Sequence, residues 1–414
     1  MKASLARWWS VRTVLRIAAA VAIVVFAFYV ARWMTRPTYG FGMYYTYSRL
    51  LFEGGDFSRV YDFDYFNTRM HEFGIATIDM PNNLPTAALP MLLIAWLPPP
   101  PAKAAWTILS IVLLLWSLRI LFRLFAVSPL ENLGLGIITL VFVFRPLYDG
   151  IALGQMYLLI LWLLCLGLSG LSKQKATLVS SSLALSMLLK GYGVVQLLWL
   201  SFKSNLRAVL GTIILAFSAV LVLLPLFGVG SWTTFYRVFA LRNVSPENSQ
   251  VLFQTVNSFL LHFFSFDAHW MPFPILALPQ WIVLGLADGM DIVLIILVIR
   301  WSGRMGKADM PLAYSASFGA GVLTFPLASE YHFVLFLPLI IGLTTRLYRG
   351  VVQSRTLRPV AIIVGLSVLV MAAPLKYQQL QQSDLPLSLL AYPKLYAGIA
   401  LILCFRHVAR QGAV

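Results

Sequence analysis

Apolar stretches long enough to cross a membrane recur along this chain from Val14 to Phe405, and no polar domain separates them. A spanning helix needs roughly 20 mostly apolar residues, and shorter ones are tolerated where they are kinked or enclosed by protein. Only 11% of the 414 residues are charged, whereas soluble proteins have about 25%, so the chain could not cover its own surface in water. The sequence therefore predicts one integral membrane domain over residues 1–414 and excludes an ordinary soluble enzyme.

Ten apolar runs are predicted to cross the membrane as helices. They are 14–31, 104–122, 133–148, 155–171, 208–228, 276–300, 311–327, 333–345, 359–375 and 391–405. The stretch 176–202 is too long for one span and is interrupted by Lys190-Gly191-Tyr192-Gly193, so two short helices should meet there. The proline-rich segment 84–101 is predicted to be re-entrant. We therefore expect an all-α polytopic membrane protein, a bundle of about 10–13 transmembrane helices, with about twelve crossings.

The basic residues fall between the apolar runs, and their distribution predicts the orientation of the chain. With a cytoplasmic N-terminus, the cytoplasmic segments hold 19 of the 31 Lys and Arg residues but only two of the 15 acids. Such an excess is typical of cytoplasmic loops. Both termini are therefore predicted to be cytoplasmic, in a multi-pass protein of the cell's inner (plasma) membrane. The segments on that side are 2–16, 119–131, 172–175, 201–207, 300–309, 344–358 and 406–414.

This charge pattern and several missing motifs restrict the possible partners. The net charge of +16 does not indicate nucleic-acid binding, because no basic helix with interleaved aromatic residues occurs. No Cys/His cluster has the spacing of a metal site, and no phosphate-cradling Gly-rich loop is present. We expect no metal, no cofactor and no ATP-driven transport. The expected partners include membrane lipids and no nucleic acid.

Two long hydrophilic segments, about 32–101 and 229–275, are predicted to face outward. Loops this long in a compact protein are usually structured and functional. The first contains six of the fifteen acids, and the N-terminal apolar run before it lacks a cleavage site and should remain as a helix. The six acids are Glu53, Asp56, Asp62, Asp64, Glu72 and Asp79.

Charged residues inside the apolar runs are the candidates for function, because a charge in the bilayer is costly. At the outer ends of their runs they predict a polar cleft for an anionic lipid headgroup, with cations for phosphate and carboxylates for hydroxyls or a proton. Each has an alternative: an Arg–Asp pair across one helical turn, a snorkelling Lys, a core His, or a buried network of two Asp. The residues are Arg145, Asp149, Lys190, Asp288, Asp291, Glu330 and His332.

Six segments in one order resemble glycosyltransferase family 87. They are GFGMYYTYSRLLFEGGDFSRVYD (Gly40–Asp62), NNLPTAALPMLLIAWLPPP (Asn82–Pro100), ALGQMYLLILWLL (Ala152–Leu164), LALSMLLKGYGVVQLLWL (Leu183–Leu200), QTVNSF (Gln254–Phe259) and SEYHFVLFLPL (Ser329–Leu339). The resemblance implies a GT-C-like membrane enzyme that moves a hexose, usually mannose, from a polyprenyl-phosphate-sugar donor to a lipid or glycan acceptor on the outer face.

The resemblance also implies roles for individual residues. Lys190 and Arg145 would bind the donor phosphate. The other substrate-binding candidates are Asn82, Asn83, Gln155, Asn257 and Glu330.

The general base is less clear from the resemblance, because Gly40 stands where the family usually has an Asp. The remaining candidates are Asp56, Asp62, Asp79 and His332, and the sequence favours Asp62 because Tyr61-Asp62 closes the recognisable loop motif. A structural role for Asp62, as the cap of a helix over 64–73, is an equally good interpretation.

Two other functions fit parts of the sequence. Broken helices that meet at Lys190 are typical of transporters, so a transporter or flippase of a lipid-linked substrate is one alternative. An inactive relative of the family is the other, because of Gly40.

Overall fold

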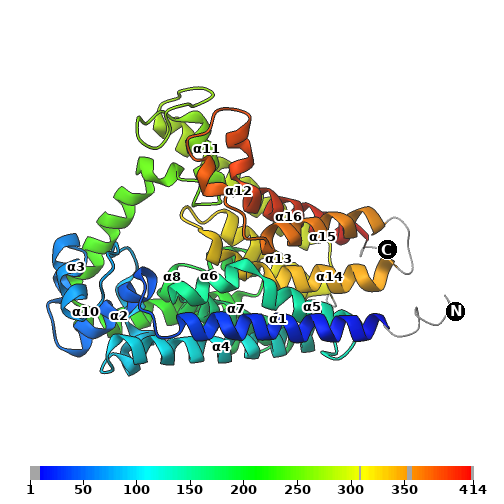
Figure 1. Ribbon diagram of the computed structural model, residues 1–414, viewed down its shortest axis with the longest axis horizontal. Coiled ribbons are helices and arrows are strands. Elements are labelled where there is room, and N and C mark those ends of the chain that lie inside the picture. Colours follow the sequence, from blue (N-terminus) through cyan, green and yellow to red (C-terminus); the bar gives the residue numbers. More distant parts are fainter. Residues whose placement is uncertain (1–9, 307–308, 352–356, 412–414) are drawn as a thin grey trace.

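The computed structural model describes residues 10–306, 309–351 and 357–411, and the regular elements of these residues are helices. The helices form a bundle that carries two lobes at one end (Figure 1). The predicted all-α membrane fold is thus confirmed. Of the basic residues that predict the orientation, four lie outside the described residues: Lys2, Arg7, Lys307 and Arg355.

In the part of the chain that the structure describes, five segments are long and apolar enough to span a membrane on their own. They are α1 (Val11–Trp33), α4 (Pro99–Leu124), α10 (Leu206–Asn243), α12 (Gln280–Ser302), and Glu330–Gly350, which combines η6 (Glu330–Phe336) with α14 (Leu337–Val351). A sixth is formed if α5 (Asn132–Val143) and α6 (Arg145–Leu153), which meet at 45°, count as one broken span. The chain is therefore a multi-pass membrane protein, while the expected twelve crossings stay a prediction.

Shorter helices complete the bundle, and several begin or end at the predicted interruptions. They are α7 (Tyr157–Ser172), α8 (Ala176–Lys190), α9 (Val194–Phe202), α13 (Met310–Leu323), α15 (Arg358–Ala372) and α16 (Pro393–Gln411). Between α8 and α9, Gly191 and Gly193 have φ of 71° and 122°. Glycine adopts this left-handed conformation without a steric penalty, so α8 ends at Lys190 as the sequence predicts.

The first lobe is built from the predicted first outer loop. It contains α2 (Tyr39–Phe52), η2 (Phe57–Arg59), α3 (Phe63–Glu72) and η3 (Pro85–Ile94). Its core is aromatic, with Phe41, Tyr44, Tyr45, Tyr47 and Phe66 fully buried. The short 3-10 helix η3 occupies part of the segment that was expected to be re-entrant.

The second lobe follows a break in α10 at Gly228, the residue at which the span over 208–228 was predicted to end. Gly228 has non-helical φ and ψ of 73° and 146°, and a second helical piece then continues to Asn243. The lobe contains η4 (Pro246–Ser249), α11 (Val256–Phe264) and two pieces from near the C-terminus, η8 (Tyr377–Leu380) and η9 (Leu387–Ala391). In Figure 1 the second half of α10 crosses the space between the lobes.

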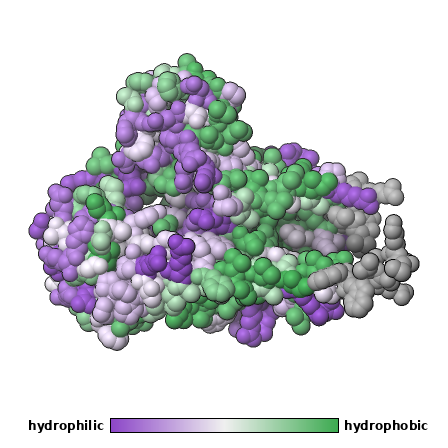
Figure 2. All heavy atoms as spheres, in the orientation of Figure 1, coloured by the Kyte–Doolittle hydropathy of each residue, from purple (hydrophilic) through white to green (hydrophobic). Residues whose placement is uncertain are grey.

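The distribution of apolar and hydrophilic residues on the surface follows the division into bundle and lobes. Apolar residues cover much of the helical bundle, and hydrophilic residues gather over the lobes and on the face between them (Figure 2). The first residue of α1 and the last of α16 lie at the end opposite the lobes (Figure 1).

Candidate functional site

A cavity of about 950 Å³ lies where the lobes meet the bundle. The loop before η3, the α8–α9 junction, the last turns of α10, and parts of α12, α13 and η6 line it. One part of its lining is polar and includes Asp79, Lys190 and Arg242, which we call the pocket cluster. Phe239 and Ile292 belong to its apolar part.

Lys190 reaches the cavity because α8 stops there. The hydroxyl of Thr86 in η3 donates a hydrogen bond to the carbonyl of Leu188, one of the carbonyls that a helix end leaves unsatisfied. This contact holds the segment before η3 against α8, so Lys190 Nζ donates to Asn83 Oδ1 at 2.6 Å. The ammonium also lies 5.1 Å from the ring centre of Tyr44 and 5.4 Å from that of Tyr157. All these partners are neutral, so the charge is held in place without being neutralised.

Asp79 lies in the loop between α3 and η3 and faces the same cavity. Its backbone is fixed by Asn67, whose side chain accepts from Asp79 N at 2.9 Å and donates to Asp79 O at 3.1 Å. Asp79 Oδ1 accepts from Met80 N at 2.8 Å, whereas Oδ2 is buried and has no hydrogen-bond partner in the described part of the chain. Burial raises the pKa of Asp79 to about 7, although the Met80 N–H and the charges of Lys190 and Arg242 act in the opposite direction.

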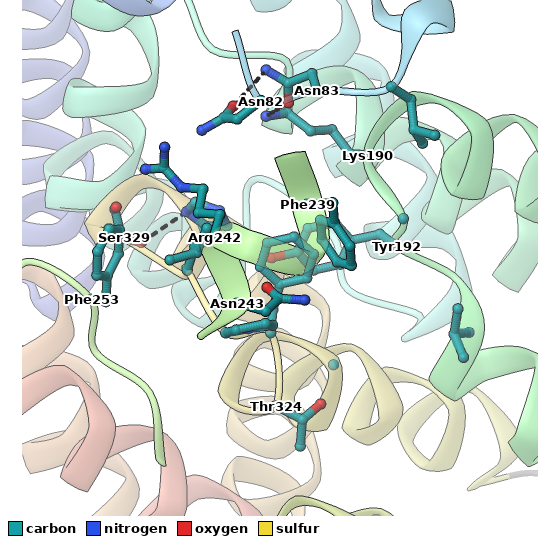
Figure 3. Close-up of a pocket in the computed structure, with 18 of the residues that line it drawn as sticks. Asn82, Asn83, Lys190, Tyr192, Phe239, Arg242, Asn243, Phe253, Thr324 and Ser329 are labelled. Carbon is teal, nitrogen blue, oxygen red and sulfur yellow. Dashed lines mark hydrogen bonds between the residues drawn. The ribbon is translucent and has the colours of Figure 1, made fainter. Parts of the chain in front are cut away.

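Arg242 completes the pocket cluster and was missed by the sequence analysis. It is in the last turn of α10, whose end carbonyls at Arg242 and Asn243 accept hydrogen bonds from Asn248 Nδ2 at 2.7 and 3.1 Å. One guanidinium nitrogen contacts the sulfur of Met80 at 2.8 Å, and Nε is buried without a partner. Figure 3 shows that Lys190 and Arg242 extend into the pocket from different elements. Two cations without an acidic hydrogen-bond partner form a site for an anion.

His332 also lines the cavity, but both of its ring nitrogens are engaged. Nδ1 lies 3.1 Å from the carbonyl of Ser329, which can only accept, so Nδ1 carries the proton. Nε2 then accepts from the hydroxyl of Tyr157. A histidine held in this way orders the surrounding side chains and has no free nitrogen to take a proton from a ligand.

Gly40 lies in α2 beside Gln155, another cavity-lining residue. A Cβ at residue 40 would lie 2.4 Å from Gln155 Nε2 and 2.8 Å from the carbonyl of Leu153. Gln155 is itself held by the hydroxyl of Tyr44, which donates to Oε1 at 3.0 Å. The space that an aspartate at residue 40 would need is therefore taken by the α6–α7 junction.

Asp56 and Asp62 do not line the cavity and act as helix caps. Asp56 Oδ1 accepts from Ser58 N at 3.1 Å, at the start of η2. Asp62 Oδ1 accepts from Tyr65 N at 3.0 Å and caps α3, and this N–H is the main reason that the pKa of Asp62 is lowered. The structure thus agrees with the capping interpretation of Asp62.

Arg145 and Asp149 form an ion pair across one turn of α6, with 2.7 Å between Arg145 Nη2 and Asp149 Oδ1. Neither residue lines the cavity. The alternative interpretation of this pair as a local i,i+4 contact therefore agrees with the structure.

Glu330 belongs to a second group, with Tyr377 and Lys394, which we call the paired cluster. Lys394 Nζ lies 2.9 Å from Glu330 Oε1 and donates to the carbonyls of Val370, Met371 and Ala373 at the end of α15. The hydroxyl of Tyr377 donates to Glu330 Oε2 at 3.3 Å. These bonds tie η6, α15 and α16 together away from the cavity.

The remaining candidates are divided between the cavity and other places. Asn82 and Asn83 line the cavity, whereas Asn257 is buried in α11 and does not. Asp288 and Asp291 line it from α12, and Asp291 Oδ1 is buried without a partner. In the described part of the chain no group of three or more His, Cys, Asp or Glu side chains is placed to hold a metal ion.

Comparison with known proteins gives one match. The family model of glycosyltransferase family 87 matches residues 84–338, which is more than half of the chain. This range contains most of the cavity-lining segments, from Leu84 in front of η3 to η6. Neither a curated protein nor a solved structure matches.

Proposed function

The chain belongs to glycosyltransferase family 87, and on this premise we propose that the cavity transfers a hexose, mannose in the first instance, from a polyprenyl-phosphate sugar to a hydroxyl of a lipid or glycan acceptor. The observation that carries the proposal is the pocket cluster. It combines a carboxylate oxygen without a partner and two cations with no acidic hydrogen-bond partner. Such a set fits a reaction in which a hydroxyl loses a proton while a phosphate gains charge.

Asp79 is the proposed general base. As the acceptor oxygen attacks the anomeric carbon, its proton passes to Asp79 Oδ2, and the bond between that carbon and the donor phosphate oxygen breaks. A base works best when its pKa lies near the working pH, and the pKa of Asp79 is about 7. With residue 40 unable to hold a side chain, Asp79 takes over the role that the family resemblance would give to an aspartate there.

Lys190 and Arg242 are the proposed partners of the leaving phosphate. The electron pair of the broken bond stays on the phosphate oxygen, so negative charge grows there as the reaction proceeds. Cations that are already oriented stabilise this charge without reorganisation. Arg145, which the resemblance favoured, is neutralised by Asp149 and is replaced by Arg242 in this proposal.

The apolar part of the cavity is the proposed channel for the polyprenyl chain. Tyr236, Phe239 and Ile292 line the cavity and are also exposed, at 75%, 39% and 57%. Apolar side chains that face both a cavity and the outer surface of α10 and α12 provide a route from the bilayer to the pocket cluster. A lipid-linked donor could enter there without leaving the membrane.

The test is transfer by the full-length protein in lipid nanodiscs. Purified protein is incubated with radiolabelled polyprenyl-phosphate mannose and total membrane lipids, and labelled product is separated from donor. We expect a labelled lipid or glycan with wild-type protein and none with Asp79→Asn, while Asp62→Asn serves as the matched control. If wild-type protein transfers from no polyprenyl-phosphate sugar, the proposal fails, and Gly40 marks an inactive relative.

The location of the site on the outer face is part of the proposal and has a separate test. The native residues Cys165 and Cys404 are buried, so they give little background. Ser58 in the first lobe and Lys175 at the opposite end of the bundle are both exposed. We expect an impermeant thiol reagent to label Ser58→Cys but not Lys175→Cys in intact cells. Labelling of only Lys175→Cys would place the lobes and the cavity on the cytoplasmic side.

A further inference from the structure

A second large cavity, of about 1050 Å³, shares no lining residue with the first. It is a groove between α1, α4 and α5, with Phe26 and Ala27 on one wall and Leu115 and Leu118 on another. α1 packs along α5 and α6, which leaves the groove between α1 and α4. The lining is almost wholly apolar.

Two arginines interrupt this apolar lining. Arg119 and Arg123 are one turn apart on α4, are exposed, and have no hydrogen-bond or ion-pair partner among the described residues. The residues that line the groove include no acid, and Glu131, the next acid along the chain, does not line it. Both arginines lie near the end of the span, in the segment predicted to be cytoplasmic, where basic side chains attract the anionic lipids of that leaflet.

Further positive charge gathers at the same end of the groove. The loop after α4 is contacted by two more arginines: Arg12 donates to the carbonyl of Leu130 at 3.2 Å, and Arg349 donates to that of Ala126 at 2.6 Å. Each of these guanidinium groups is held by a neutral carbonyl, so its charge is not cancelled. The end of the groove is therefore a site of positive potential, where none of the four arginines has an ion-pair partner among the described residues.

The dimensions of the groove fit one lipid chain. Along α4 the lining runs from Ile111 to Arg123, and twelve residues of helix rise about 18 Å. The hydrocarbon part of one leaflet is about 15 Å thick. A chain that fills the groove would therefore bring its headgroup to Arg119 and Arg123.

We propose that the α1–α4–α5 groove binds one anionic glycerophospholipid, with an acyl chain in the apolar part and the phosphate on Arg119 and Arg123. Arginine suits this role because its planar guanidinium can bind phosphate oxygens with two parallel hydrogen bonds. The lipid phosphate would be the anion that the described residues lining the groove do not supply. It also fills a cavity that would otherwise reduce packing between α1 and α4.

The proposal is tested by native mass spectrometry of the full-length protein in detergent, with phosphatidylglycerol and phosphatidylcholine of identical acyl chains added in separate experiments. We expect phosphatidylglycerol to bind at one site at least tenfold more tightly than phosphatidylcholine. Arg119→Gln/Arg123→Gln should remove this preference, a loss of at least tenfold. The control Lys173→Gln/Lys175→Gln removes the same charge from an exposed turn that does not line this groove and should change binding less than twofold.

A second variant separates the groove from the charges. Ala27→Trp leaves both arginines in place but fills the apolar part, so it should also lower phosphatidylglycerol binding at least tenfold, with an unchanged melting temperature as the check on folding. Equal binding of the two lipids, or equal effects of the Arg and Lys double variants, would overturn the proposal. So would a dimer whose formation depends on Ala27, because the groove would then be an interface between copies.

Discussion

The pocket cluster and the paired cluster each contain a carboxylate and at least one cation. These charges form an ion pair in the paired cluster but not in the pocket cluster. In the paired cluster, Lys394 meets Glu330 and three backbone carbonyls, and Glu330 also accepts from Tyr377. In the pocket cluster, Asp79 keeps one oxygen without a partner and forms no ion pair with Lys190 or Arg242.

This difference shows why charge inside the membrane is an incomplete guide to function. A buried charge costs free energy unless it is paired and hydrogen-bonded, so a paired group is explained by the fold alone. A group that the fold leaves unpaired still has free energy to gain from a ligand. We therefore infer a structural role for the paired cluster, and the chemical role proposed for the pocket cluster rests on its unpaired groups.

The largest expected effect tests the chemical role directly. Asp79→Asn keeps the shape and the contact with Met80 N but removes the proton acceptor. General base catalysis contributes about 10²- to 10⁴-fold, so the transfer rate should fall by that factor. The melting temperature should not decrease, because no ion pair is lost. A rate within about threefold of wild type would exclude Asp79 as the base.

Lys394→Met should have the opposite effect, a loss of stability rather than a specific loss of transfer rate. The substitution keeps a side chain of similar length but leaves Glu330 buried without its cation and the end of α15 without donors. Breaking a buried pair in this way typically costs about 3–5 kcal/mol of unfolding free energy. Thermal unfolding in detergent measures the loss, and the protein that remains folded should still bind donor.

A double variant sharpens the same comparison. Glu330→Gln/Lys394→Met removes both charges, so it should be more stable than Lys394→Met alone. If the double variant were destabilised relative to wild type by the sum of the two single effects, the two residues would act independently and the paired cluster would not exist as a unit.

Lys190→Ala removes one of the two cations of the pocket cluster. Loss of a group that stabilises developing charge costs roughly 2–4 kcal/mol in the transition state, which corresponds to about 30- to 10³-fold in rate. Arg242→Ala should produce a loss of similar kind. Single-turnover transfer measures both, and Arg145→Ala is the control outside the cavity. Equal losses for all three variants would indicate a general electrostatic effect rather than contact with phosphate.

The helices were predictable to a greater extent than the site. Apolar runs reveal where spans lie, and the glycines after Lys190 reveal where α8 stops, because both signals are local. The first lobe has no such signal: its buried faces in α2 and α3 are aromatic and interrupted by polar residues, so the segment resembled a hydrophilic loop. The helical piece after the break at Gly228 was missed because polar and basic residues interrupt its apolar ones, so the segment resembled a hydrophilic loop.

Some site residues could be predicted from the sequence, whereas the roles of others depend on tertiary packing. Lys190, Asn82, Asn83 and Gln155 were expected to be near a substrate, and they line the cavity. Which loop acid loses its contact with water depends on packing against other elements, so the sequence favoured Asp62 over Asp79. The remaining differences have the same cause: Arg242 reaches the cavity only because α10 continues, and Glu330 is neutralised by a lysine 64 residues later in the chain.

The pH dependence is a smaller test of the unpaired carboxylate. Because the pKa of Asp79 is raised to about 7, the base is mostly protonated at pH 6 and mostly ionised at pH 8. The transfer rate should therefore rise by about tenfold over this interval and level off above it. Stability should change in the opposite sense: the unfolded group has a pKa near 4 and binds fewer protons than the folded group between about pH 4 and 7, so stability falls as pH rises through that window.

These opposite trends distinguish a base from a structural acid. Asp79→Asn should abolish the rise of the transfer rate with pH. It should also abolish the part of the fall in stability with pH that comes from Asp79. Asp62, whose pKa is lowered, contributes stability above the unfolded pKa and loses it as pH falls, so it cannot produce the same pattern. A rate that is flat from pH 6 to 8 in wild-type protein, with chemistry limiting, would mean that no group with the pKa of Asp79 takes the proton.

The smallest effect is expected at Asp62, the acid that the sequence favoured. Asp62 is exposed at the start of α3, where its carboxylate accepts from Tyr65 N and lies 3.4 Å from Arg59. Asp62→Ala removes the cap and should lower the melting temperature by only a few degrees, while Asp62→Asn keeps a capping oxygen and should lower it less. Both variants should transfer sugar within about twofold of the wild-type rate, since neither changes the cavity. If Asp62→Asn instead lost as much activity as Asp79→Asn, α3 would have to bring Asp62 into the cavity during the reaction. The proposal that the base is the acid with a buried, unpaired oxygen would then be wrong.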